Sequence, residues 1–203
     1  MTEPTAKDLL ERNRKWSAET RREDPEFFSR LADQQNPRFL WIGCSDSRVP
    51  ANQITGLVPG QIFVHRNVAN LAHPTDVNLM SVLEYAVDVL RVEEILVVGH
   101  YGCGGVRAAL QGRLPGIADF WLESIRDLCR SHRKDLAHLQ GSDLEDRVCE
   151  LNVVEQVEAL SHSGIVLGAW RRGQPLAIHG WIYSVGDGIL QDLGVTCSSP
   201  GIE

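Results

Sequence analysis

RFLWIG, residues 38–43, is a short and almost wholly apolar run that ends in glycine, and Cys44 follows it directly. Short apolar runs of this kind, bounded by turn residues, predict buried strands. Two more such runs are QIFVH (61–65) and EILVVG (94–99). Strands that are apolar along their whole length are typical of a parallel sheet, because helices cover both of its faces. These stretches therefore predict an α/β fold.

Helical segments alternate with these strands. Apolar side chains recur at helical spacing over residues 74–90, residues 117–139 predict a second helix, and Ser142-Asp143-Leu144-Glu145 fits a capping box that opens a third, toward His162. Residues 174–183 and 189–195 predict two strands joined by the turn signal Gly186-Asp187-Gly188. The expected architecture is a mostly parallel β-sheet flanked by helices, with one antiparallel edge strand.

The start of the chain has a different pattern. Residues 6–31 are helical in periodicity and heavily charged, with an interruption near Asp24 and Pro25. Their apolar stripe consists of Leu9, Leu10, Trp16, Phe27, Phe28 and Leu31. An exposed apolar stripe of this kind is stabilised when another surface packs against it. We expect residues 1–203 to form a single domain whose N-terminal helical arm, residues 1–33, packs on its own domain or wraps around a partner subunit.

Size and charge exclude several classes of protein. The chain has 203 residues, a mass of 22.6 kDa and a formal net charge of −7. An acidic chain does not offer the basic face that nucleic acid requires. No apolar run approaches the roughly 20 residues that span a bilayer, so no membrane partner is expected. The N-terminus lacks the pattern of a secretory signal, which predicts a cytoplasmic protein.

Metal-ligating side chains follow two of the predicted strands. Cys44 and Asp46 come after the first strand, and His100 and Cys103 come after the third. If those strands are neighbours, two thiolates, one imidazole and one carboxylate converge, which is a tetrahedral donor set for Zn²⁺. Two alternatives stay open at this point: the cysteines could be buried core thiols, or the Gly-rich segment 102–105 could cradle a phosphate.

The two motifs together resemble those of a known family. CSDSRVP (44–50) followed by HYGCGGV (100–106) is similar to bacterial β-class carbonic anhydrases, and the resemblance extends to residues 64–70, residues 178–181 and Tyr183. It covers most of the chain. It implies that Cys44, His100 and Cys103 are permanent zinc ligands and that Asp46 is an exchangeable fourth.

The activity that the resemblance implies is reversible hydration of CO₂ to bicarbonate by attack of zinc-bound hydroxide. Asp46 must leave the metal for turnover, and Arg48 can draw its carboxylate away with a planar bidentate fork. Asp46 would then accept the hydrogen of the attacking oxygen and orient it. The alternative for this pair is a surface ion pair of little energetic weight.

Further residues are assigned by the same resemblance. Gln35 would donate an amide hydrogen to the substrate, and an apolar pocket wall would consist of Phe63, Val68 and Tyr85. The backbone N–H of Gly104, next to a ligand and at the start of a helix, is a candidate donor to a developing oxyanion. For Gln35 and the wall residues, the alternative is ordinary core packing.

A regulatory site is implied as well. Trp41, Arg66 and Tyr183 match the residues that hold a non-catalytic bicarbonate in one bacterial subgroup, where the anion and low pH favour the state with Asp46 on zinc. Asn52 departs from that subgroup, which commonly has Glu there. The alternative is a pair of buried aromatic residues with a structural arginine.

The expected partners are CO₂ and bicarbonate as small-molecule substrates and further copies of the chain in a homodimer or homotetramer. Two rival functions remain: hydrolysis of CS₂ or COS on the same zinc site, and a zinc-stabilised binding module without catalysis. Cys129, Cys149 and Cys197 have no assigned role, and an odd number of cysteines without a secretion signal argues against a disulfide framework.

Overall fold

The computed structural model describes residues 3–33 and 35–199 and divides the chain into two compact units, with the boundary after Asn36. The first unit contains α1 (Ala6–Glu23) and α2 (Phe27–Asp33). Thr5 and Asp8 form a reciprocal capping box that starts α1, and the chain leaves helical geometry at Asp24, as the sequence predicts. Among the described residues, α1 and α2 contain none that is buried.

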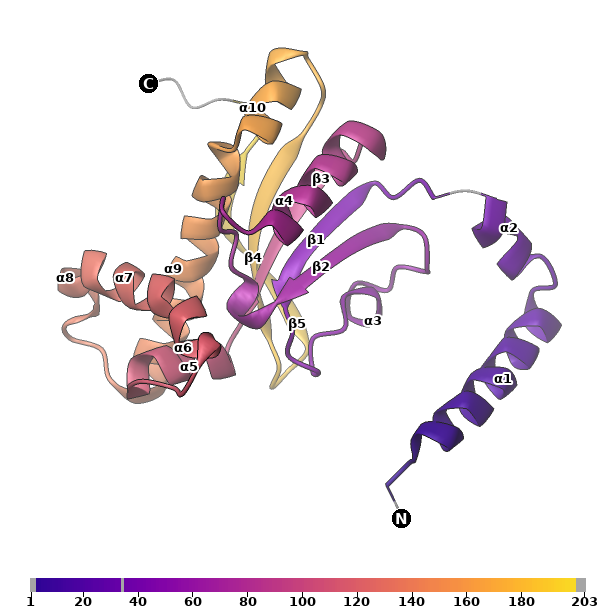
Figure 1. Ribbon diagram of the computed structural model, residues 1–203, viewed down its shortest axis with the longest axis horizontal. Coiled ribbons are helices and arrows are strands. Elements are labelled where there is room, and N and C mark those ends of the chain that lie inside the picture. The colour runs from indigo at the N-terminus through magenta and orange to yellow at the C-terminus, as the bar shows by residue number, and fades with distance from the viewer. Residues whose placement is uncertain (1–2, 34, 200–203) are drawn as a thin grey trace. The chain divides into compact units, whose positions relative to one another are not determined.

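The second unit is built on a sheet of five strands (Figure 1). These are β1 (Phe39–Cys44), β2 (Ile62–Asn67), β3 (Glu94–His100), β4 (Ala177–Ser184) and β5 (Ile189–Cys197). Their order is β2-β1-β3-β4-β5; the first four are parallel, and β5 runs antiparallel to β4. The predicted fold class is confirmed, including the antiparallel edge strand and the turn before it.

Helices cover the two faces of the sheet unequally. They are α3 (Ala51–Thr55), α4 (Val77–Glu84), α5 (Gly104–Gln111), α6 (Ile117–Trp121), α7 (Glu123–Ser131), α8 (Arg133–Leu136), α9 (Gly141–Ser161) and α10 (Gly164–Arg171), with a 3₁₀ turn at Val68–Asn70 and a π-helical turn at Tyr85–Val89. The larger core contains Leu40 and Ile42 of β1 together with buried residues of α4, α9 and α10. The opposite face carries a smaller core around Trp41, Val98 and Tyr183, with Ala51 of α3.

Two glycines let α9 lie close to the sheet. A Cβ added at Gly99 would stand 2.6 Å from Val153 Cγ2, and one at Gly180 would stand 3.0 Å from Val153 Cγ1. Any side chain at these positions would push the helix away from β3 and β4. The close approach matters for the site, because α9 packs directly against the two strands and carries polar side chains toward their carboxyl ends.

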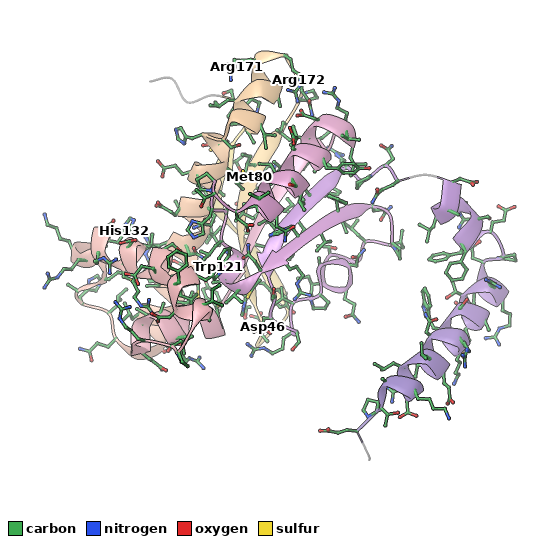
Figure 2. The ribbon with its side chains drawn as sticks, in the orientation of Figure 1. Asp46, Met80, Trp121, His132, Arg171 and Arg172 are labelled. Atoms are coloured by element: carbon green, nitrogen blue, oxygen red, sulfur yellow. The ribbon has the colours of Figure 1, made fainter. Side chains whose placement is uncertain are left out.

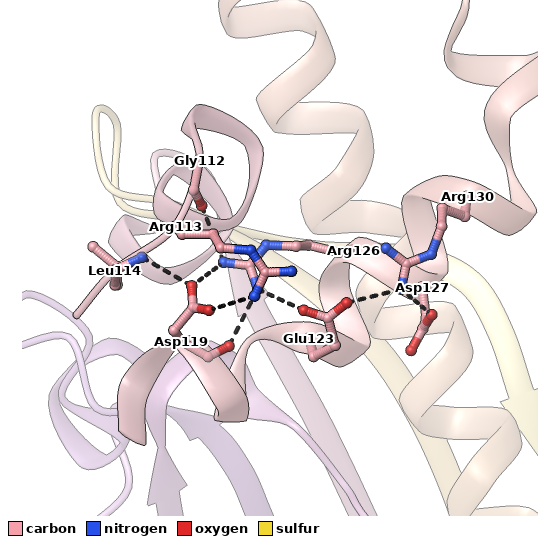
Figure 3. Close-up of polar contacts among 8 residues, drawn as sticks. All are labelled: Gly112, Arg113, Leu114, Asp119, Glu123, Arg126, Asp127 and Arg130. Carbon is pink, nitrogen blue, oxygen red and sulfur yellow. Dashed lines mark hydrogen bonds and ion pairs between the residues drawn. The ribbon is translucent and has the colours of Figure 1, made fainter. Parts of the chain in front are cut away.

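The prediction of a single helix over residues 117–139 is wrong, because the structure has three shorter helices there. The chain turns out of helical geometry at Leu122 and again at His132, which divides the segment into α6, α7 and α8. Figure 3 shows what holds the first corner: Arg126 of α7 reaches back to the carboxylate and carbonyl of Asp119 and to the carbonyl of Gly112. These are tertiary contacts of one arginine, and the local apolar periodicity does not report them.

Other boundaries differ by smaller amounts. The capping box predicted at residues 142–145 is wrong, because α9 begins at Gly141 after an extended Gln140 and no side chain caps it. The helix expected over residues 74–90 begins at Val77, capped by Asp76, and ends in the π-helical turn. Helix α10 was not anticipated. Among the described residues, no helix combines the length and apolar character needed to cross a membrane.

Candidate metal centre

The metal-ligating motifs meet because β1 and β3 are neighbours. The strands are parallel and in register, with Gly43 beside Val98, so their carboxyl ends lie at one edge of the sheet. Cys44 is the last residue of β1, His100 is the last residue of β3, and Cys103 caps α5 three residues later. Asp46 lies at the same edge, just beyond β1 (Figure 2). The convergence predicted from the sequence therefore follows from strand adjacency.

The three donors have the spacing of a tetrahedral metal site. One ligand atom from each of Cys44, His100 and Cys103 lies within 4.8 Å of the others, and all three residues are buried. The two sulfurs are 3.9 Å apart. Two thiolates bound at about 2.3 Å to one tetrahedral Zn²⁺ would be separated by roughly 3.8 Å. The observed separation therefore fits zinc without movement of either strand.

The imidazole of His100 is oriented for metal binding. Its Nδ1 lies 3.0 Å from the carbonyl oxygen of Tyr101, to which it donates, so Nε2 carries the free lone pair. Nε2 is buried and has no hydrogen-bond partner among the residues that the structure describes. A buried polar atom without a partner is costly in a folded protein. A zinc ion bound between the two sulfurs would satisfy it, and this is the strongest structural sign that the donors fit the metal.

The pKa values of the two thiols are shifted in opposite directions. The hydrogen bond from Cys103 lowers the pKa of the Cys44 thiol, and the backbone N–H groups of Asp46 and Ala69 lower it further. The same contact with Cys44, together with burial, raises the pKa of Cys103. The contact therefore favours the thiolate at Cys44 and the thiol at Cys103, and a metal that binds both sulfurs must displace the proton of Cys103.

The Asp46 carboxylate is engaged with Arg48. Arg48 Nε lies 2.9 Å from Asp46 Oδ1 and Nη2 lies 2.7 Å from Oδ2, while the Arg48 backbone N–H also donates to Oδ1. These contacts hold the pKa of Asp46 well below its usual range. Asp46 Oδ2 is only 3.8 Å from His100 Nε2. The carboxylate thus borders the three donors while Arg48 holds it.

The three predicted effector residues lie on one face of the sheet. In the strand register Trp41 and Gly43 share a face of β1, Arg66 pairs with Gly43, and Tyr183 belongs to the same small core as Trp41. The Trp41 indole Nε1 is buried, and within the described part of the chain it has no hydrogen-bond partner. Arg66 Nε donates to the Cys44 carbonyl at 2.8 Å, and its Nη2 donates to the Asp46 carbonyl.

The predicted pocket residues are more dispersed. Phe63 and Tyr85 contact each other, with ring centroids 5.9 Å apart, and Val68 lies against Gly105 at the start of α5. Val68 and Tyr85 are about half exposed in the single chain. A Cβ at Gly104 would meet nothing within 4 Å, so the space in front of its backbone is open. Gln35 is exposed and belongs to the first unit, and its role stays a prediction.

Sequence reasoning missed the backbone groups that orient the metal-ligand candidates. The Tyr101 carbonyl fixes His100, and the Ala69 N–H reaches the Cys44 sulfur. Both act through the backbone, so no residue type signals them. Tyr101 itself is held by its hydroxyl, which donates to Glu150 of α9 at 2.9 Å, and by its N–H, which donates to the Tyr183 carbonyl.

Comparisons with known proteins agree with this geometry. A family profile described as carbonic anhydrase matches residues 39–190, which include all three metal-binding candidates. A solved β-carbonic anhydrase from Coccomyxa, in complex with acetazolamide, superposes with a TM-score of 0.92 at 41% identity, over 98% of this chain and 90% of that chain. The chain belongs to the β-carbonic anhydrase family.

Two further relatives of this β-carbonic anhydrase are informative. A carbonic anhydrase of Emericella nidulans is 44% identical over 201 residues, which is 98% of this chain and 87% of the relative. A structure of tetrameric β-carbonic anhydrases from Sordaria macrospora has a TM-score of 0.89 at 37% identity, covering 94% of this chain and 97% of that chain. These fungal relatives support the family and its β class but give no support to the expected bacterial branch.

Proposed function

We propose that the protein is a carbonate dehydratase that interconverts CO₂ and bicarbonate at a zinc ion held by Cys44, His100 and Cys103. The observation that carries this proposal is the buried donor triad, with the unpartnered Nε2 of His100, beside the Asp46–Arg48 pair. Zinc in such a site supplies a Lewis acid that activates water for attack on CO₂ near neutral pH.

Asp46 and Arg48 control the open side of the site. On Arg48, the Asp46 carboxylate is an acceptor only, so it can take the hydrogen of the attacking water and direct the oxygen lone pair toward the carbon of CO₂. The bidentate fork of Arg48 keeps this carboxylate off the triad. Gly104 begins α5, which supports its N–H as the donor that stabilises the oxygen on which charge develops.

The substrate pocket has the predicted apolar wall. Phe63, Val68 and Tyr85 supply surface suited to a small nonpolar gas. Gln35, in the first unit, stays a predicted amide donor to the substrate. The contact between Phe63 and Tyr85 supports a shared wall, and the half exposure of Val68 and Tyr85 fits a pocket that a second copy of the chain completes.

We further propose that bicarbonate binds beside Trp41, Arg66 and Tyr183 and inhibits the enzyme, as low pH also does. The free indole N–H of Trp41 in a dry setting supports an anion at this place. Arg66 donates to the carbonyls of Cys44 and Asp46, so an anion that draws the guanidinium away would release the Asp46 loop.

Asn52 stands where the bacterial subgroup commonly has Glu, so the coupling between the effector site and the Asp46 loop differs in this protein. Asn52 donates its amide to the carbonyls of Leu57 and Val58, so it stabilises the end of α3.

Activity measured against bicarbonate concentration tests the effector site. Trp41→Phe and Tyr183→Phe should each weaken the inhibition, and a variant that kept full inhibition would refute the assignment.

We propose a cytoplasmic homodimer or homotetramer. The Sordaria macrospora relatives are described as tetrameric, which supports assembly of this kind. Leu9, Leu10 and Trp16 of α1 remain about half exposed or more, which supports a role for the arm at a subunit interface.

Stopped-flow CO₂ hydration by protein of measured zinc content tests the function. We expect fast hydration that a chelator abolishes and zinc restores. Turnover of CS₂ or COS without CO₂ hydration would favour the rival hydrolase. Stoichiometric zinc with no turnover of any of these gases would leave a non-catalytic zinc-binding module.

A further inference from the structure

The 3₁₀ turn that follows β2 contains strained backbone beside the metal centre. Ala69 has φ 64° and ψ 28°, and Asn70 has φ 47°. Both are left-handed conformations, which asparagine tolerates and alanine adopts at a cost. Ala69 is fully buried, so solvent does not stabilise the turn. Strain of this kind persists only where the surrounding structure enforces it, and it concentrates at functional sites.

A buried polar ladder on α9 enforces the turn. Asn152 Nδ2 donates to the Ala69 carbonyl at 2.9 Å, and Gln156 Nε2 donates to Asn152 Oδ1 at 2.9 Å. Gln156 Oε1 accepts from the Ala72 N–H at 2.7 Å. The ladder therefore holds both ends of the segment 69–72. Asn152 and Gln156 are both buried, and neither takes part in the proposed chemistry.

The strained turn faces the first metal ligand. With its carbonyl bound to Asn152, Ala69 directs its N–H to the Cys44 sulfur. Its methyl group lies at the start of α5, where a Cβ on Gly105 would come within 3.1 Å of it. Hydrogen bonds to a metal-bound thiolate withdraw electron density from sulfur and fix its orientation, and such outer contacts tune both affinity and reactivity of the metal.

We propose that Asn152 is a positioning residue of the zinc centre: its amide, oriented by Gln156, holds Ala69 in the left-handed conformation that aims its N–H at the Cys44 sulfur. This inference rests on the proposed zinc centre. It assigns to α9, an element that supplies no ligand, control over the electron density and orientation of one thiolate.

The test compares Asn152→Leu with the wild type in two measurements that do not depend on turnover. The first is the zinc dissociation constant, obtained by competition with a chromogenic chelator. The second is the energy of the thiolate-to-metal charge-transfer band of Co²⁺-substituted protein. We expect the dissociation constant to rise by about 10- to 100-fold, because the thiolate loses a contact that fixes its orientation. The charge-transfer band should shift as well, because a thiolate that loses a hydrogen bond becomes a stronger electron donor.

Leu160→Ala is the matched control, because it removes a buried side chain from the same helix, further along it from the centre. It should lower thermal stability without moving the cobalt band. The double variant Asn152→Leu with Ala69→Gly should recover zinc affinity, because glycine adopts the left-handed turn without the amide that holds it. Should Asn152→Leu not fold, Gln156→Leu gives the second test, with a smaller shift in the same direction.

Three outcomes decide the matter. Weaker zinc binding with a shifted band, rescued by Ala69→Gly, supports the proposal. Wild-type affinity and an unmoved band in Asn152→Leu, or changes equal to those in Leu160→Ala, overturn it. Absence of zinc binding by the wild type would contradict the proposed function itself, which separates the two failures.

Discussion

Asp46 is the residue on which the proposed chemistry turns, because it borders the metal donors and is held by Arg48 in a bidentate pair. Asp46→Asn keeps the size of the side chain and removes the acceptor-only carboxylate. We expect kcat/KM for CO₂ hydration to fall by about 100-fold with zinc content unchanged, since Cys44, His100 and Cys103 remain. Stopped-flow kinetics and metal analysis measure both.

Asp187→Asn serves as the control for this change. Asp187 is an exposed aspartate in the turn between β4 and β5, and its replacement should leave the rate unchanged. An Asp46→Asn enzyme as fast as the wild type would refute the role of the carboxylate. Arg48→Lys should give an intermediate loss, because lysine keeps the charge but not the planar fork.

The cysteines should respond differently to zinc. The hydrogen bond from Cys103 lowers the pKa of Cys44, which favours the thiolate in zinc-free protein, whereas burial raises the pKa of Cys149 to about 12. Since the thiolate is the nucleophile, iodoacetamide at pH 7 should label Cys44 in zinc-free protein and not in zinc-loaded protein. Cys149 should stay unlabelled in both. Peptide mass spectrometry reads each site, and labelling of Cys44 that zinc leaves unchanged would contradict the assigned ligand.

At the scale of elements, the α6–α7 corner depends on one arginine. The side chain of Arg126 is only 13% exposed and pairs with Asp119 and Glu123, and Glu123 also binds Arg130 (Figure 3). A hydrogen bond from the Leu114 N–H, supported by Arg126, lowers the pKa of Asp119. Hydrogen bonds from Arg130 and Arg126 lower the pKa of Glu123. The α6–α7 corner is therefore stabilised mainly by ion pairs and hydrogen bonds between charged side chains.

The pH dependence of this corner follows from those directions. Carboxylates whose folded-state pKa is lowered stabilise the fold fully above their unfolded values, near 4, and the stabilisation is lost as pH falls through the folded values. Hydrogen-exchange protection of residues 112–131 should therefore be high at pH 6 and decline below about pH 4. In Arg126→Leu the protection should already be low at pH 6.

Arg113→Ala is the control for the corner, because Arg113 pairs with the same Asp119 but is 76% exposed. Exposed pairs contribute little, so its protection should match the wild type. Equal protection in Arg126→Leu and Arg113→Ala would contradict the proposed role of the buried arginine.

Sequence patterns predicted the parts of the molecule that depend on local chemistry and strand order. The apolar runs before Cys44 and His100 predicted two strands of a mostly parallel sheet, and the structure shows that these strands are neighbours, which brings their carboxyl ends to one edge. The clustering of the three metal-ligand candidates was therefore predictable on the condition that the strands are adjacent. The corner at Leu122 was not, because Arg126 makes it through tertiary contacts. The left-handed Ala69 was not either, because its conformation depends on Asn152, which lies 83 residues further along the chain.

At the scale of the whole molecule, both units expose apolar side chains that a second copy of the chain could cover. The sheet unit has a complete metal triad, yet the predicted pocket residues Val68 and Tyr85 are about half exposed in a single chain. In the first unit, Leu10 of α1 is 60% exposed and Trp16 is 49% exposed. An amphipathic helix with an uncovered apolar stripe gains stability only when another surface covers that stripe.

Deletion of residues 1–36 should therefore reduce the mass of the assembly in solution, because it removes the apolar stripe while the sheet unit keeps its own core. Light scattering coupled to size exclusion measures the mass, circular dichroism checks the fold, and zinc content checks the triad. Leu10→Ser with Trp16→Ser in the full chain should act in the same direction, whereas Lys15→Ala, a change at a polar position of α1, should not. A deleted chain that stays folded and keeps the full assembly mass would show that the arm does not hold the subunits together. A smaller assembly that binds zinc but hydrates CO₂ poorly would show that the pocket needs a second copy.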